Sequence, residues 1–434
     1  VLLHQFHDIL PGSSIAWVHR EARETYAGVA AELEGIIAGA QRALAGDGDR
    51  ELVFNPAPHT RHGVPSGGAS VAAAGAGGGV PPVPREGGGH VLDNGLLRVE
   101  IDGRGLVVSV YDHTAGREAV APGQAANLLQ LHPDFPNQWD AWDVDAFYRN
   151  TGSDLVDVTG LRVEGTAVRV ERAFGGSRVT QLLSVPRDAG RLDIETEVDW
   201  HESERFLKLA FPLDVKADRY ASETQFGHVY RPTHQNTSWE WAKFEACNHR
   251  FVHVDEPGWG VALVNDATYG HDVTRTVRAD GGTTTTVRAS LLRAPRYPDP
   301  ETDQGVHVFR HALVPGAAIG DAVREGHRAH LPERRVTGGP DVAPLVTVGE
   351  DAVVVSAVKL ADDRSGDLVV RLYEANGARA RTTVRADGFD PARAVRTDLL
   401  ERPLPDAPLP CAADGGVPLE LRPFQMVTLR LPRV

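Results

Sequence analysis

Two histidines and an aspartate lie close together near the start of the chain, in the segment 4–12 (HQFHDILPG). His4 and His7 are three residues apart and would share one face of a helix end, and Asp8 follows directly. Neutral imidazole and carboxylate groups bind divalent metals, but a metal site needs at least three protein ligands. The segment offers two or three at most. Taken alone, it is therefore better explained by helix capping and core packing than by metal binding.

A second cluster, residues 137–145 (NQWDAWDVD), combines two tryptophans with alternating acids. The rings of Trp139 and Trp142 could stack on sugar rings, and carboxylates such as that of Asp140 accept hydrogen bonds from paired hydroxyls. The same acids could coordinate calcium. A solvated acidic loop held in place by two tryptophans is an equally good interpretation, so all three possibilities stay open.

Two arginine-bearing segments are further candidates for ligand binding. Residues 230–245 include Arg231 and almost every type of hydrogen-bonding side chain, with almost no strand periodicity. Loops of this kind on a rigid scaffold often carry binding residues, although a loop that only satisfies its own polar groups is the alternative. Residues 293–301 (RAPRYPDPE) form a rigid charged turn, in which Arg293 and Arg296 could clamp a carboxylate or a hydroxyl.

The elements that must position these residues begin with a helix. Apolar residues recur every three or four positions over residues 15–44, which predicts one amphipathic helix of about eight turns. The helix should end at residues 46–49 (GDGD), where helical preference is lost. Its apolar stripe includes Leu33 and Ile36 and needs partners to cover it. No second long helix is evident in the sequence.

From residue 51 onward the pattern becomes that of β-strands. Apolar and charged residues alternate at 192–200 (LDIETEVDW), and the run 207–215 (LKLAFPLDV) repeats the pattern. Turn residues separate such runs at hairpin distances, which favours antiparallel sheets packed as sandwiches over a parallel α/β sheet. The Gly-, Ala- and Pro-rich residues 63–89 cannot bury enough apolar surface to order themselves, so we expect a flexible loop or linker there.

The predicted fold class is therefore mainly β, with antiparallel β-sandwiches and one long N-terminal helix. We divide the chain into four consecutive parts. They are a helical end with the histidine-aspartate segment at 1–48, a short strand and linker at 49–90, a large β-sandwich domain at 91–335, and a small C-terminal β-domain at 336–434.

Composition excludes several classes of function. The 434 residues suffice for about three domains, and the net charge of −14 makes nucleic acid and anionic lipid poor partners. No apolar run approaches the ~20 residues of a membrane-spanning helix, so no membrane association is expected. Cys247 and Cys411 are too few for a disulfide framework or a thiolate zinc site. The chain starts at Val1 and its single methionine is Met426, so we expect it to be a piece of a longer protein.

Together the segments resemble one known family. Residues 5–13 (QFHDILPGS) are similar to the histidine-aspartate motif of glycoside hydrolase family 38, the retaining α-mannosidases, in its bacterial and cytosolic-type branch. Further segments resemble the β-region of that branch, in family order. These segments are residues 53–56, 97–116, 139–145, 231–245, 260–270 and 291–305.

The resemblance implies a fold and a set of site residues. Members of the family have an N-terminal α/β barrel with a zinc ion, an aspartate nucleophile and an aspartate acid/base, then a three-helix bundle and β-sandwich domains of galactose-mutarotase-like type. By the same resemblance His7 is a zinc ligand and Asp8 hydrogen-bonds mannose hydroxyls. Phe6 stands where the secretory-pathway branch has an additional histidine, which does not remove the ligand. Lower-ranked substrate contacts are Arg231, Arg293, Arg296, Trp139 and Asp140.

We therefore expect a portion of a zinc-dependent retaining α-mannosidase that hydrolyses terminal α-D-mannosyl residues of glycans or oligosaccharides. Its partners would be that glycan and the N-terminal barrel of the same protein, and the cytosolic-type branch implies a cytoplasmic location. The barrel, with the nucleophile, the acid/base and the other zinc ligands, is not among these residues. Because one histidine cannot hold a catalytic zinc, the isolated chain is expected to be inactive.

Two alternatives remain. A non-catalytic carbohydrate-binding β-sandwich module would share the β architecture, but a free-standing module should lack the uncovered apolar stripe of the long helix. An epimerase acting through histidine and glutamate side chains of the sandwich is weaker, because no spaced pair of these residues in the sequence demands it.

Overall fold

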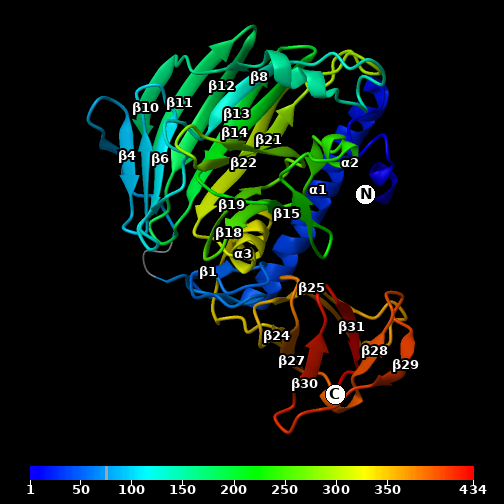
Figure 1. Cartoon of the computed structure of the whole chain (residues 1–434). Helices are drawn as coiled ribbons and strands as arrows, with labels where there is room; N and C mark the ends of the chain where they lie inside the picture. The colour runs from blue at the N-terminus through cyan, green and yellow to red at the C-terminus, as the bar shows by residue number, and fades with distance from the viewer. Residues whose placement is uncertain (74–76) are drawn as a thin grey trace. The chain divides into compact units, whose positions relative to one another are not determined.

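The structure is a computed structural model that describes residues 1–73 and 77–434. Antiparallel sheets make up most of it (Figure 1). The predicted fold class, mainly β with one long N-terminal helix, is confirmed. The chain forms two compact units. The first contains residues 1–38, 77–222 and 230–318, and the second contains the described residues of 39–76 together with 223–229 and 319–434.

Two sheets enclose the core of the first unit. A nine-stranded sheet has the order β10-β11-β12-β13-β22-β19-β18-β15-β16, and a six-stranded sheet has the order β17-β20-β21-β14-β8-β9. The strands of the larger sheet are β10 (Gly160–Glu164), β11 (Ala167–Phe174), β12 (Ser177–Ser184), β13 (Leu192–Trp200), β22 (Gly305–Pro315), β19 (Trp259–Asn265), β18 (Phe251–Glu256), β15 (Arg219–Thr224) and β16 (Gly227–Pro232). Those of the smaller sheet are β17 (Ala246–Cys247), β20 (Gly270–Val277), β21 (Thr283–Leu292), β14 (Arg205–Leu213), β8 (Leu128–Pro133) and β9 (Ser153–Asp154).

A five-stranded sheet and three short helices complete the β-rich part of the first unit. The sheet has the order β3-β4-β5-β6-β7. Its strands are β3 (Val83–Pro84), β4 (His90–Asp93), β5 (Leu97–Ile101), β6 (Val107–Asp112) and β7 (Arg117–Glu118). The short helices are η1 (Leu2–Gln5), η2 (Ala146–Thr151) and α2 (Ser238–Trp241).

The two large sheets bury the apolar faces that the alternation predicts. In β13 every second residue is buried, including Ile194, Val198 and Trp200. In β14 Leu207, Leu209 and Phe211 face the same core, but the residues between them are buried as well. A second layer of side chains therefore covers the outer face of the smaller sheet, which the alternation in the sequence did not indicate.

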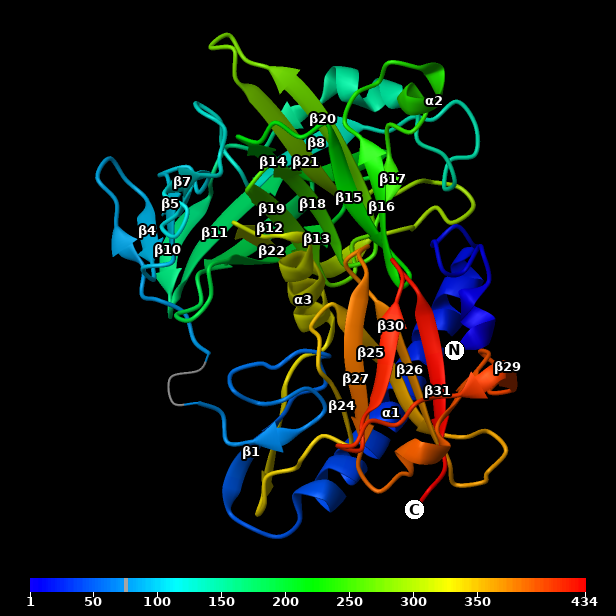
Figure 2. The same cartoon turned by 60° about the horizontal axis from the view of Figure 1, so that its bottom comes forward.

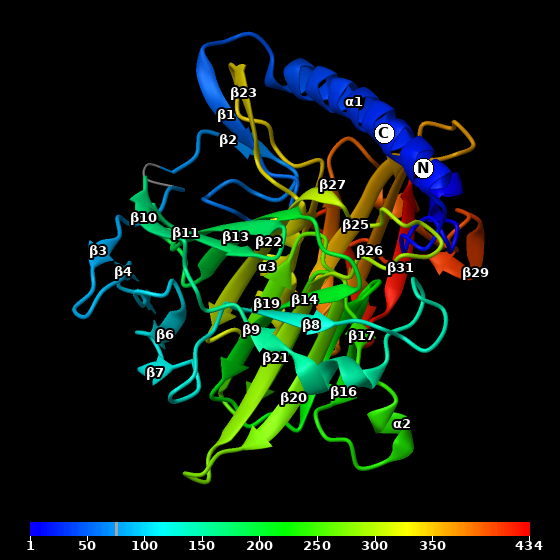
Figure 3. The ribbon, with the colours of Figure 1, turned by 90° about the horizontal axis from the view of Figure 1, so that it is seen from above.

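The long helix is confirmed as α1 (Ala16–Ala45), and Figure 3 shows it as one continuous helix. Most of its residues are exposed, and the apolar stripe lies open: Leu33 is 51% and Ile36 is 60% exposed. Burial of a large aliphatic side chain stabilises a fold by about 1.5–3 kcal/mol. A packing partner on this stripe would therefore add to the free energy of unfolding. Neither α1 nor any other described helix is long and apolar enough to cross a membrane.

The second unit contains a small sandwich at its C-terminal end, whose strands β25, β26 and β31 lie side by side in Figure 2. Its sheets have the orders β24-β27-β30 and β25-β26-β31-β28-β29, and a further sheet has the order β2-β1-β23. The elements are β1 (Arg50–Phe54), β2 (Ala69–Ser70), α3 (Ile319–His330), β23 (Arg334–Gly338), β24 (Val346–Val348), β25 (Val353–Leu360), β26 (Leu368–Glu374), β27 (Ala380–Ala386), η3 (Pro391–Arg393), β28 (Val395–Thr397), β29 (Pro403–Pro408), β30 (Val417–Leu421) and β31 (Met426–Leu431).

The sequence missed one element, and one expectation from it needs correction. Helix α3 was not predicted, because its apolar face is only three turns long and Gly326 weakens its helical preference. Residues 63–89 were expected not to order, yet Val64 and Ala69 are fully buried in the second unit and Val80 joins the core of the first. Residues 74–76 of that stretch lie outside the described residues. The two compact units interleave along the sequence. The division of the chain into four consecutive parts stays a prediction.

Candidate functional site

The histidine-aspartate segment forms a short turn of 3₁₀ helix and not one helical face. His4 is buried against Tyr26, with ring centroids 5.1 Å apart, and the Tyr26 hydroxyl donates to the His4 carbonyl. The helix ends at Gln5, and the side chain of His7 is 78% exposed. The expectation that His4 and His7 share one face is therefore wrong. His4 is a packing residue, whereas His7 is accessible to a ligand.

Asp8 connects this segment to the second predicted cluster. Its Oδ1 accepts hydrogen bonds from the Trp142 indole N–H at 3.0 Å and from the Ser13 hydroxyl at 3.3 Å. Its Oδ2 lies 3.6 Å from Nε2 of His7. Two segments that are 134 residues apart in the sequence thus meet at one carboxylate, as expected for parts of one site.

The first turn of helix α1 also contacts a loop of the sandwich. Nδ1 of His19 lies 3.0 Å from Oδ2 of Asp299, and both side chains are almost buried. Nε2 of the same ring accepts from the backbone N–H of Ser14 at 3.3 Å. Together these contacts hold the histidine-aspartate segment against the loop that follows β21.

The aromatic rings of the second cluster are exposed as carbohydrate binding requires. Trp139 is 66% exposed, and its ring meets that of Trp142 edge to face at 6.4 Å. Tyr297 adds a third ring, 6.5 Å from Trp142. Trp139 has a φ of 60°, a conformation that costs energy in a residue with a side chain and that is often found at functional sites.

The acids of the second cluster stabilise its backbone. Oδ2 of Asp140 accepts from the N–H groups of Arg296 and Tyr297, at 2.7 and 3.0 Å. Asp145 accepts in the same way from Asn137. The described residues contain no group of three or more histidine, cysteine, aspartate or glutamate side chains placed to hold a metal ion.

The three predicted arginines lie in different environments. Arg293 is committed to the protein: it donates to Asp134 at 2.7 Å and to the carbonyl oxygen of Asp143 at 2.6 Å. Burial raises the pKa of Asp134, an effect that the hydrogen bond from Arg293 opposes. Arg296 is exposed, with Glu204 at 3.9 Å. Arg231 is half-buried, and its buried Nε has no hydrogen-bond partner among the described residues.

A cavity of about 590 Å³ lies where several of these segments converge. Its size falls in the range of about 300–1,000 Å³ that is typical of small-molecule sites. It is lined by Pro11, Gly12, Ala141, Val144, Phe206, Arg231, Glu245, Ala246, Cys247, Gly270, Ser290, Leu291, Leu292, Arg293, Pro295, Thr302 and Asp303. Ala294 lies between two of these residues, Arg293 and Pro295. It is buried and has a φ of 56°, so the backbone of the cavity wall is strained there.

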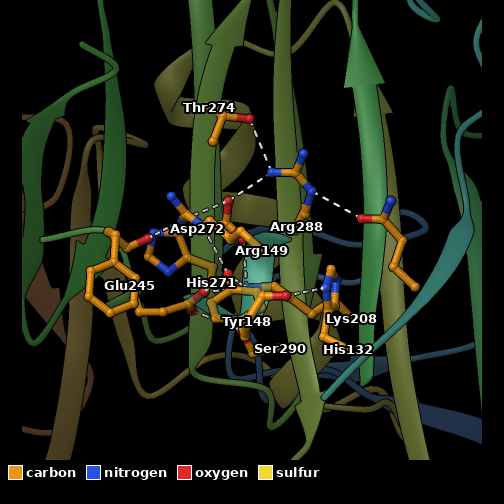
Figure 4. Close-up of polar contacts among 12 residues, drawn as sticks. His132, Tyr148, Arg149, Lys208, Glu245, His271, Asp272, Thr274, Arg288 and Ser290 are labelled. Atoms are coloured by element: carbon orange, nitrogen blue, oxygen red, sulfur yellow. Dashed lines mark hydrogen bonds and ion pairs between the residues drawn. The ribbon is translucent and has the colours of Figure 1, made fainter. Parts of the chain in front are cut away.

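Glu245 of the cavity wall belongs to a buried ionic cluster, which Figure 4 shows. Lys208 of β14 is completely buried, and its Nζ contacts the carboxylate of Glu245 and lies 2.6 Å from that of Asp272. The hydroxyl of Tyr148 donates to the same oxygen of Glu245. Arg288 lies 2.8 Å and Arg149 lies 3.3 Å from the fully buried Asp272. This ionic cluster consists of Lys208, Asp272, Glu245, Tyr148, Arg149 and Arg288. Its members from outside the sheet, Tyr148, Arg149 and Glu245, form the second layer over β14.

The charges of the cluster stabilise one another against burial. Burial by itself would lower the pKa of Lys208, but Asp272 and Glu245 outweigh it and hold that pKa above its ordinary value. Burial would raise the pKa of Asp272, and Lys208 with two arginines reverses the direction. Burial raises the pKa of Tyr148, so its hydroxyl keeps its proton and acts as a donor. Lys208 and Asp272 therefore stay charged, and Tyr148 stays protonated, around neutral pH.

Sequence reasoning missed this cluster. Lys208 alternates with apolar residues in β14, which is the pattern of a solvent-facing position. The residues that cover it come from η2 and from the loop before β17, 60 and 37 residues away. No spacing rule connects these segments. The one signal in the sequence was that Lys208 stands among uncharged residues: apart from Arg205 at the start of β14, it is the only charged residue of that strand.

Comparisons with known proteins identify the class. Residues 1–44 match the model of the alpha mannosidase middle domain. Residues 92–301 match that of the glycosyl hydrolases family 38 C-terminal domain, and residues 352–429 match that of the family 38 C-terminal beta sandwich domain. The chain therefore belongs to glycosyl hydrolase family 38, and it corresponds to a C-terminal portion of an α-mannosidase of that family.

Individual relatives agree with this assignment. The chain is 34% identical to human alpha-mannosidase 2C1 in an alignment of 475 positions, gaps included, that covers 99% of this chain and 44% of the human protein. It is 29% identical to an alpha-mannosidase of Saccharomyces cerevisiae, covering 99% of this chain and 43% of the yeast protein. The chain thus spans less than half the length of these relatives.

Solved structures show the same fold. An alpha-mannosidase from Enterococcus faecalis V583 superposes with a TM-score of 0.61 at 17% identity, over 78% of this chain and 42% of that protein. A glycosyl hydrolase family 38 protein from Enterococcus faecalis superposes with a TM-score of 0.63 at 16% identity, over 85% of this chain and 47% of that protein.

Proposed function

We propose that this chain is the part of a zinc-dependent retaining α-mannosidase that completes the glycan site and carries its β-sandwiches. Its substrate would be the terminal α-D-mannosyl residues of glycans or oligosaccharides. The observation that carries the proposal is the contact of Asp8 with Trp142, which brings the histidine-aspartate segment to exposed aromatic rings. The named relatives, which are alpha-mannosidases, support this substrate class.

The chain could supply one zinc ligand, His7, but not a complete zinc site. The His7 ring is exposed, so a nitrogen is available to a metal. Among the residues that the structure describes, however, no three potential ligands come together, and zinc sites use three or four protein ligands. When bound, zinc would orient sugar hydroxyls. The role of Asp8 would be to accept hydrogen bonds from those hydroxyls beside His7.

Retaining hydrolysis needs two carboxyl groups ~5 Å apart, one as the nucleophile and one as the acid/base. We propose that both belong to a barrel outside these residues, as the resemblance implies. The uncovered stripe of α1, with Leu33 and Ile36, supports the presence of further helices beside it and argues against a free-standing binding module.

The 434-residue chain alone is expected to show no turnover of an aryl α-mannoside, because His7 and Asp8 can hold a sugar but neither supplies the pair of catalytic carboxyls. Release of a chromogenic leaving group, in buffer with added zinc, measures this directly. Turnover by the purified chain that disappears in a His7→Ala variant would contradict the proposal, since it would place the whole catalytic apparatus in these residues.

A further inference from the structure

Glu245 lines the cavity and has an acceptor position that the protein does not fill. Its Oε1 accepts from Lys208 and from Tyr148, and its Oε2 accepts from the Ser290 hydroxyl at 3.1 Å. A carboxylate offers about four acceptor positions, two on each oxygen. One position on Oε2 therefore remains, on a side chain that is 17% exposed at the cavity wall.

Arg231 lines the same cavity and offers donors. It is half-buried, and the structure shows no acceptor for its buried Nε among the described residues. Arg293, the other arginine of the cavity wall, is already engaged by Asp134 and by two backbone carbonyls. No hydrogen bond or ion pair to another described residue engages the Arg231 side chain, so Arg231 is the arginine of this cavity wall that can donate to a ligand.

A hydroxyl both donates and accepts, so a sugar ring can satisfy a carboxylate acceptor and a guanidinium donor at once. The apolar part of the wall, which includes Pro11, Pro295 and Leu292, suits the C–H face of such a ring. An anionic ligand would be disfavoured by the carboxylates of Glu245 and Asp303, both in the cavity wall. The cavity therefore matches a neutral polyhydroxylated ligand better than an anion.

We propose that this cavity is a subsite for a neutral hexose residue of the glycan, in which Glu245 accepts from one ring hydroxyl and Arg231 donates to another. The inference rests on the proposed function and adds a second sugar contact beside His7 and Asp8. Lys208 and Tyr148 are positioning residues, because they act on the sugar only through Glu245. The ionic cluster thereby fixes the carboxylate in the orientation that leaves Oε2 open.

Calorimetric titration of the 434-residue chain with methyl α-D-mannoside and with an α-mannotriose tests this subsite. The trisaccharide should bind measurably, and Glu245→Gln and Arg231→Met should each weaken it about tenfold, as expected for hydrogen bonds to charged groups. Tyr148→Phe should weaken it about threefold while the melting temperature changes little, a result that a purely structural role would not give. Glu195→Gln and Arg310→Met, from an exposed ion pair of the same sandwich, are the controls and should bind as the wild type does.

The outcomes separate the subsite from the general proposal. Unchanged affinity in both Glu245→Gln and Arg231→Met would overturn the subsite, as would failure of the wild-type chain to bind either mannoside. Tighter binding of a phosphorylated mannose that depends on Arg231 and not on Glu245 would show an anion site and would also overturn it. None of these results bears on mannoside hydrolysis by the longer protein, which is measured separately.

Discussion

Replacing Lys208 by methionine is expected to lower the free energy of unfolding of the first unit by about 3–5 kcal/mol. Removal of one partner from a buried ion pair leaves the other charge without compensation, which is among the largest single effects known for substitutions. Asp272 is fully buried and would keep only its two arginines, while Glu245 would lose its closest cation. Equilibrium unfolding in urea, followed by near-ultraviolet circular dichroism, measures the change.

Lys216→Met is the matched control, because Lys216 is an exposed lysine of the same unit and should change the free energy of unfolding by less than about 0.5 kcal/mol. The double variant Lys208→Met with Asp272→Asn removes both charges and should be less destabilised than the sum of the two single variants. If Lys208→Met costs less than about 1 kcal/mol, Lys208 does not compensate the buried carboxylates of the cluster.

The second large effect is a loss of stability in mild acid. Burial lowers the pKa of His271 to about 3 and that of His311 to about 4. Both pKa values in the folded protein lie below the pKa of about 6.5 that a histidine has in the unfolded chain, so the unfolded chain binds protons more readily. The free energy of unfolding therefore has its full value above about pH 6.5 and falls as the pH decreases towards 4. At pH 5 each histidine should cost about 2 kcal/mol relative to pH 7.

Urea unfolding at pH 7 and pH 5 tests this effect, and His311→Leu identifies the source. Neither ring nitrogen of His311 has a hydrogen-bond partner among the described residues, so leucine should be tolerated there. The variant should lose about 2 kcal/mol less than the wild type between the two pH values. An equal pH dependence in both proteins would show that His311 does not remain neutral in the folded state.

The sequence was a reliable guide where the apolar residues of an element repeat with one clear period. The alternation in β13 marks the side that is buried, and the helical repeat of α1 marks a helix even though its apolar stripe is exposed. Both elements appear where they were predicted. The pattern failed in β14, because Lys208 alternates with apolar residues yet lies beneath a second layer. It also failed for α3, which is short and contains Gly326, a residue of low helical preference.

The candidate site shows the same limit. His7 and Asp8 were singled out by a short motif, and the structure places Asp8 against Trp142 of another predicted cluster. Glu245 stood at the edge of a third cluster with no assigned role. Its partners on η2 and β14 lie 97 and 37 residues away in the sequence, and no regular spacing connects them. Long-range contacts of this kind require coordinates.

The central claim, that His7 serves a zinc-dependent mannosidase site, is tested most directly in the protein encoded by the complete reading frame that contains these residues. The measurement is kcat/KM for an aryl α-mannoside together with the zinc content, for the wild type and for His7→Ala. The control is His201→Ala, which replaces another exposed histidine of the first unit. We predict that His7→Ala lowers both zinc content and kcat/KM, the latter by about a hundredfold or more, while His201→Ala changes neither. Wild-type zinc content and activity in His7→Ala would contradict the claim.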